Sequence, residues 1–250
     1  MPQLMRTSNP ALNEQTFRGE RAAFGEAMTV QGTVNKTGIL LLCAVVTAAW
    51  TWNLFLRTHS SEVVAPLVLV GVVGGLIFAI ATIFNKTWAP VTAPIYALFE
   101  GLVLGSVSAI LELRFPGIAI QAVSLTFGTL VCLLVAYRSG LIRVTDKFRL
   151  GIVAATGGIA VFYLIEMVLG FFGIHFTAVN GAGPIGIGFS VFVVIIAALN
   201  LVLDFDFIES GARAGAPKYM EWYGAFGLLV TLIWLYFEIL RLLSKLRSRE

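Results

Sequence analysis

Ionisable side chains lie inside or beside long apolar segments of this sequence, and their types and spacing indicate the chemistry available to the chain. At the centre of a membrane-spanning helix an Asp costs roughly 2.5–3.5 kcal/mol on insertion scales, so each such group needs a partner or a role. Carboxyl groups held at depth can relay protons or bind cations. The acidic residues concerned are Glu100, Glu166, Asp204, Asp206, Glu221 and Glu238, and the polar amide of Asn200 lies close to Asp204 in the sequence.

Asp204 ends an apolar run, and Asn200 lies four residues before it. Residues four apart share one face of a helix, so we expect both side chains to point into a helical bundle. Asp206 faces roughly the other way, near Glu209, which can pair with Arg213 at i+4. The alternative for all three acids is a solvated helix end at the inner surface of the membrane.

Glu221 opens the last apolar segment, in Tyr219-Met-Glu-Trp-Tyr223. If the preceding hairpin turns near residues 212–214, counting outward from the turn places Glu221 level with Asp204–Asp206. Two carboxylates within a few ångströms cannot both ionise cheaply, so such a pair could hold one proton or chelate a cation. The alternative is an interfacial Glu beside Lys218.

Glu238 lies 17 residues beyond Glu221, which is roughly 25 Å along a helix. We therefore expect it near the opposite membrane face, where Arg241 or Arg57 could pair with it. The alternative is an exposed helix end.

Glu100 and Glu166 are the acids that the sequence places deepest. Tyr96 precedes Glu100 by one helical turn, and Tyr163 precedes Glu166 in the same way. Full solvation is a poor explanation for either. Two interpretations stay open: a structural hydrogen bond between helices, or a relay for protons or cations.

The segments that must position these residues are membrane helices. Of 250 residues, 58% are hydrophobic and 12% are charged, whereas soluble domains carry roughly 25% charged residues. About 20 apolar residues span a hydrocarbon core of roughly 30 Å. We predict an all-α, seven-transmembrane-helix bundle over residues 37–250, preceded by a polar tail over 1–36. The expected spans are 37–56, 63–84, 91–111, 117–137, 150–174, 185–203 (extended by 204–210) and 222–243.

Lys and Arg in short loops predict the orientation. With the N-terminus inside, the inner segments hold eleven such residues and the outer loops only Arg57 and Arg114. Seven full spans would leave the basic C-terminal residues outside, against the rule. Either this tail is an exception, or one segment enters and leaves on the same side.

Several function classes are disfavoured. The net charge of +3 is spread over loops, so we expect no nucleic-acid partner. His59 and His175 lie in loops, and the sequence contains neither a Gly-x-Ser-x-Gly turn nor His-Glu-x-x-His. We expect no enzyme activity, no metal centre and no resident cofactor.

Several segments carry a resemblance that covers nearly the whole chain. The sequence resembles the Bax inhibitor-1/YccA family, and specifically a bacterial branch of it with a longer tail. The segments are Met5-Arg-Thr-Ser-Asn-Pro10, Gly32-Thr-Val-Asn-Lys-Thr37, Leu98-Phe-Glu-Gly-Leu-Val-Leu-Gly105, Leu203-Asp-Phe-Asp-Phe-Ile-Glu209 and Trp234-Leu-Tyr-Phe-Glu-Ile-Leu-Arg-Leu-Leu243.

The resemblance implies a seven-helix fold with a central last helix, in a bacterial inner membrane. Members are described as pH-sensitive calcium leak channels or as modulators of cell death and membrane-protein quality control. The family's pore closure is associated with an Asp pair, one in helix six and one in helix seven. Asp204 matches the first, and either Glu221 or Glu238 stands where the second is expected, with Glu replacing Asp.

The first hypothesis is a pH-sensitive cation leak channel, with calcium as the expected and transiently bound ion. Asp204 with Glu221 or Glu238 would form its gate. Glu100, Asp206, Glu166 and Asn200 would line the ion pathway. The alternative is a non-conducting regulator that binds another membrane protein, such as a membrane protease, through its tail. A secondary transporter is a weaker third hypothesis, because the sequence shows no clear inverted repeat.

Overall fold

Seven long apolar helices make up most of the computed structural model, which describes residues 27–173 and 176–249. Each is long and apolar enough to cross a membrane, so the prediction of an all-α, seven-helix bundle is confirmed. The helices are α1 Val30–Thr58, α2 Ser61–Phe84, α3 Ala89–Arg114, α4 Ile118–Arg138, α5 Asp146–Phe171, α7 Pro184–Arg213 and α8 Met220–Arg247, with a short 3-10 turn η2 Lys86–Trp88 and a four-residue helix α6 Thr177–Asn180.

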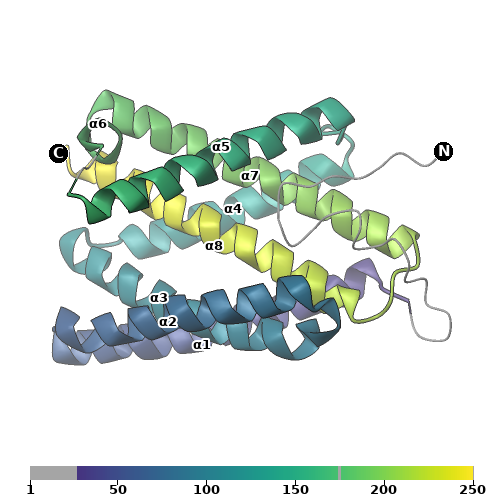
Figure 1. Ribbon diagram of the computed structural model, residues 1–250, viewed down its shortest axis with the longest axis horizontal. Coiled ribbons are helices and arrows are strands. Elements are labelled where there is room, and N and C mark those ends of the chain that lie inside the picture. Colours follow the sequence, from purple (N-terminus) through teal and green to yellow (C-terminus); the bar gives the residue numbers. More distant parts are fainter. Residues whose placement is uncertain (1–26, 174–175, 250) are drawn as a thin grey trace.

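The last helix, α8, passes between two groups of helices (Figure 1). Helices α1, α2 and α3 lie together on one side of α8, and α5 and α7 lie on the other. α8 packs against α7, α1, α4 and α3, whereas α2 lies mainly against α3, and α5 against α7. Consequently α8 is the most buried of the seven helices and α5 the least.

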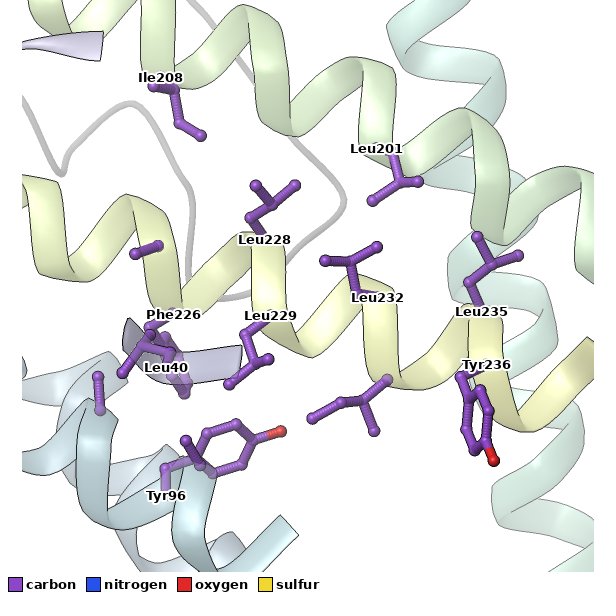
Figure 2. Close-up of a cluster of buried hydrophobic side chains, with 14 of the residues drawn as sticks. Leu40, Tyr96, Leu201, Ile208, Phe226, Leu228, Leu229, Leu232, Leu235 and Tyr236 are labelled. Carbon is purple, nitrogen blue, oxygen red and sulfur yellow. The ribbon is translucent and has the colours of Figure 1, made fainter. Parts of the chain in front are cut away.

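The core of the bundle forms on opposite sides of α8. Its leucines at positions 228, 232 and 235 point toward α7, while Phe226 and Leu229 point toward α1 and α3 (Figure 2). Tyr96 of α3 meets the Phe226 ring edge-on, with 5.0 Å between ring centroids. A helix that is apolar around most of its circumference belongs in an interior, which explains the central position of α8.

The first helix begins seven residues earlier than the predicted span. Thr29 caps α1, because its hydroxyl accepts a hydrogen bond from the Gly32 amide at 2.9 Å. The polar residues before Thr37 therefore continue the helix, although hydropathy assigned them to the tail. Residues 1–26 of that predicted tail lie outside the described residues. α7 runs without a break through residues 204–210 and ends at Arg213.

The two ends of α8 lie at opposite ends of the bundle. Met28 near the start of α1 donates to Ala216 O in the α7–α8 loop at 2.7 Å. At the other end, Arg247 donates to Pro116 O in the α3–α4 loop at 2.6 Å. α8 therefore runs from one end of the bundle to the other. Both alternatives for the basic C-terminal residues stay predictions.

Helices α1 and α3 approach closely through small residues. A methyl group at Gly101 would overlap Ala44 O, and one at Gly105 would overlap Ala48 O. Small residues let helix backbones come together in lipid, where little hydrophobic force draws helices to one another. The Gly101–Gly105 pair therefore determines how tightly α3 lies against α1.

We predict that Gly105→Leu destabilises the bundle, because the added side chain must push α1 away from α3. Overpacking of this kind costs about 1–3 kcal/mol. The measurement is the unfolding transition of the purified protein in detergent. Gly128→Leu on α4 is the matched control, since a Cβ at Gly128 meets nothing within 4 Å. If the unfolding midpoints of the two variants are equal, the argument that Gly105 determines the close approach of α1 and α3 is contradicted.

Candidate functional site

Asp204 lies in the interior of the bundle, where its position on α7 predicted it. Its side chain is 1% exposed, and Asn200, one turn earlier, is also buried. The Asn200 amide donates to Thr156 Oγ1 on α5 and to Ile196 O, both at 2.8 Å. Helical spacing therefore forms a buried polar stripe along α7, with a carboxyl group at one end.

The register between α7 and α8 shows what lies level with Asp204. Gly224 of α8 packs against Ile208 of α7, since a Cβ at Gly224 would lie 3.3 Å from Ile208 Cγ1. Counting four residues along each antiparallel helix places Asp204 level with Leu228. Leu201, a further turn along, lies opposite Leu232, in agreement with this register (Figure 2).

This register separates Asp204 from both predicted partners. Glu221 lies seven residues from position 228 and Glu238 lies ten, which corresponds to about 10 and 15 Å along α8. The expected carboxylate pair is therefore not brought together. The reason is the length of the hairpin: α7 continues to Arg213, and the loop runs to Tyr219, so α8 begins later than the count from the sequence assumed.

Glu221 instead joins the start of α8 to the start of α1. Its fully buried carboxylate accepts from the Thr29 amide and hydroxyl, both at 2.9 Å, and forms an ion pair with Lys36. Lys218 Nζ lies 3.4 Å away. A side chain at Gly32 would overlap the carboxylate. The expected neighbour Lys218 is present, but Lys36 and Thr29 were missed, because residues before Thr37 were assigned to the tail.

Glu238 joins α8 to α5 nearer the other end of the bundle. The Tyr163 hydroxyl donates to Glu238 Oε1 at 2.9 Å, and Arg241 Nη1 lies 3.5 Å from the same oxygen. Of the two expected partners of Glu238, Arg241 and Arg57, Arg241 is therefore the one that lies beside it. Glu238 Oε2 is buried and accepts no hydrogen bond within the described part of the chain.

Asp206 belongs to a network that ties α7 to α5 and α4. Arg149 Nη2 donates to Asp206 Oδ2 at 2.7 Å, and the Tyr137 hydroxyl donates to Glu209 Oε2 at 2.5 Å. Glu209 also forms the expected i+4 contact with Arg213, at 3.6 Å. Asp206 is therefore engaged with neighbouring helices and is not a merely solvated helix end.

Glu100 and Glu166 lie apart from this region. Glu100 is half-buried beside Tyr96 and faces α2, where a Cβ at Gly75 would lie 3.0 Å from its carboxylate. Glu166 accepts a hydrogen bond from the Asn180 amide of α6, close to the end of the bundle. The expectation that Glu166 is among the deepest acids is wrong, because α5 ends five residues after it. Both acids therefore contact another segment, and the relay interpretation of each stays a prediction.

Lys245 is a charged core residue that sequence reasoning counted only as part of a basic tail. Its side chain is 7% exposed. The ammonium donates to Val179 O at 2.7 Å, to Gly186 O at 3.1 Å and to Ser190 Oγ at 2.9 Å. The available signal was helical spacing, since Lys245 lies seven residues after Glu238, on the same face of the last helix.

Together these residues form a series of buried charges along the centre of a membrane bundle. Glu221, Glu238 and Lys245 occupy successive levels of α8, and Asp204 contributes a carboxyl group from α7 between the first two. Such groups can take up and release protons and change how helices fit together. Within residues 27–173 and 176–249, no cluster of three or more His, Cys, Asp or Glu could hold a metal ion.

The fold and these buried charges define a polytopic helical membrane protein built around a central last helix. A family model described as Bax inhibitor 1 like matches residues 9–248. The chain therefore belongs to the Bax inhibitor 1-like family. This is a family of membrane channels and regulators that are not known as enzymes. No curated protein and no solved structure matches the chain.

We predict that Glu221→Gln lowers the free energy of unfolding by about 3–5 kcal/mol, since Lys36 then loses the charged partner of a buried ion pair. The measurement is a denaturation curve in detergent. The double variant Lys36→Met with Glu221→Gln should recover part of the loss. Glu62→Gln, at an exposed position in the first turn of α2, serves as the control. If Glu221→Gln has the same free energy of unfolding as the control variant, the Glu221–Lys36 ion pair does not stabilise the fold as argued.

Proposed function

We propose that this protein is a proton-sensitive cation leak pathway, with calcium as the expected ion, and that Asp204 is its proton sensor. The observation that supports this proposal is a carboxyl side chain of α7 that is only 1% exposed, at the level of Leu228 of α8. Membership of a family of membrane channels and regulators agrees with it. The gate proposed here is one carboxyl group rather than a pair.

The gating argument follows from solvation. An ionised carboxylate buried inside a membrane bundle is costly, and water or a cation that reaches it lowers this cost. Deprotonation of Asp204 would therefore favour a wider α7–α8 contact that admits water and cations. Protonation would favour the closely packed state. Proton exchange at one site would in this way bias a contact between two helices.

The charged groups around Asp204 pair with residues near them on the same or other helices. Asp206, two residues on, pairs with Arg149 of α5. Along α8, Glu221 pairs with Lys36, and Glu238 lies beside Arg241. These pairs would hold the helices on either side of Asp204 while the α7–α8 contact opens. Asn200 would extend the path along α7.

For the test, the full chain is reconstituted in liposomes and calcium flux is recorded against pH. We expect flux at alkaline pH that falls on acidification. Asp204→Asn, which mimics the protonated side chain, should give the low flux at every pH. Asp146→Asn is the matched control, because the Asp146 side chain is 69% exposed. If Asp204→Asn leaves the flux and its pH dependence unchanged, Asp204 is not the sensor.

A non-conducting regulator is the second candidate, and one contact favours it. The chain enters α1 beside the α7–α8 loop, where Ala27 pairs with Pro217 and Met28 with Ala216. A membrane protein bound to residues 1–26 would thus act next to the Glu221–Lys36 pair. With the N-terminus on the cytoplasmic side of a bacterial inner membrane, as the Lys and Arg distribution favours, this partner would be reached from the cytoplasm.

Deletion of residues 1–26 separates the two candidates. A leak pathway should keep its calcium flux in liposomes after this deletion, since the buried charges lie in the helices. A regulator should lose co-isolation of its membrane partner, such as a membrane protease, from solubilised membranes. Loss of flux in a deletion variant with normal unfolding behaviour would count against the leak pathway.

A further inference from the structure

A cavity of about 470 Å³ lies between α1 and α4, a size typical of small-molecule sites. Its floor is formed by α3 and α8, including Gly105 and Leu229, which are buried. Its rims carry exposed apolar residues, among them Val45 of α1 and Ile120 of α4. The cavity is therefore a groove between two membrane helices that is open on its outer side.

The surroundings of this groove indicate an acyl chain as the occupant. Helices α1, α3, α4 and α8 all have the length and composition of membrane spans, so the open side of the groove faces hydrocarbon. Burial of an acyl chain contributes about 0.8 kcal/mol per CH₂ only where the chain leaves water. Binding from the bilayer must instead rest on fit and on polar contacts at the head group.

Polar groups lie along one side of the groove. Ser108 and Tyr236 share a hydrogen bond of 2.6 Å in its floor. On α1 the lining residues recur at helical spacing through Ala49 and Asn53, and the next position of that stripe is Arg57. Arg57 lies in the last turn of α1 and is exposed. A guanidinium thus stands at the end of an apolar groove, where a lipid phosphate would lie.

The carboxylate of Glu112 does not compete with an anionic head group for Arg57. Glu112 of α3 lies near the start of α4, but its carboxylate already accepts from the Gly117 amide at 2.5 Å and the Ala119 amide at 3.0 Å. The other charged side chains at this loop, Arg114 and Arg247, are basic: Arg114 lies over the Phe115 ring, and Arg247 donates to Pro116 O. The charge at this end of the groove therefore complements a phosphate.

We propose that the α1–α4 groove binds one anionic phospholipid, with an acyl chain along Ala49 and Leu229 and its phosphate at Arg57. This proposal is independent of the leak pathway. The bound chain would lie against α8 on the side opposite α7. The site would thus place a membrane lipid in contact with the central helix.

Binding is measured by native mass spectrometry of the full chain in detergent, titrated with phosphatidylglycerol or phosphatidylcholine. We expect one retained phosphatidylglycerol and weaker retention of phosphatidylcholine. Arg57→Gln should lower the preference for phosphatidylglycerol about fivefold, from roughly 1 kcal/mol per basic residue. Arg138→Gln, an exposed Arg at the other end of the bundle, should not. Equal retention of both lipids by the unmodified protein would overturn the proposal. Stronger retention of phosphatidylcholine than of phosphatidylglycerol, or retention of a protein in place of a lipid, would also overturn it.

A second pair of variants tests the groove itself. Ala49→Phe fills the groove and should abolish retention of the lipid, whereas Ala160→Phe, at an exposed position on α5, should leave it intact. A further readout is tryptophan fluorescence in nanodiscs that contain a small fraction of brominated phosphatidylglycerol. The brominated acyl chain in the groove should quench the fluorescence of Trp52, which lines the groove, so this quenching should be lost in Trp52→Phe. Trp50→Phe should retain that quenching, since Trp50 is exposed outside the groove. Loss of quenching in Trp50→Phe but not in Trp52→Phe would refute the site.

Discussion

The burial of α8 at the centre of the bundle is the constraint on which the rest of the structure depends. Lipid cannot satisfy polar groups, so each charged side chain on this helix must find its partner within the protein. Glu221 finds Lys36 on α1, Glu238 finds Tyr163 on α5, and Lys245 finds oxygen atoms at the start of α7 and in α6. The charges of α8 thus connect the two groups of helices between which it lies.

The same anchoring determines the surroundings of Asp204. With Glu221 held by α1, the α7–α8 register places Asp204 level with Leu228, about two helical turns from the nearest acid of α8. In the proposed leak pathway, repulsion between two carboxylates would then be a poor source of gating energy. The desolvation of a single ionised carboxylate would cost more than this repulsion at that separation, and in this proposal it would act on the α7–α8 contact.

Close packing of α3 against α1 is accompanied by an opening beside it, between α1 and α4. Gly101 and Gly105 bring α3 against α1, while α4 packs on α8 and α7. The groove between α1 and α4 lies where these two arrangements meet, and α8 forms part of its floor. Lipid contact on one side of α8 and proton exchange on the other would therefore act on one rigid element.

The sequence by itself determined the membrane class, the seven helices and the inward face that carries Asn200 and Asp204, because hydropathy and helical spacing are local properties. It also indicated the family, through segments spread along the chain. The partners of the charged residues were decided only by the tertiary structure. Glu221 depends on where α1 begins, the separation of Asp204 from the acids of α8 depends on the length of the α7–α8 loop, and the burial of Lys245 depends on α6. These are contacts between residues far apart in sequence, and helical spacing carries no information about which helix lies opposite.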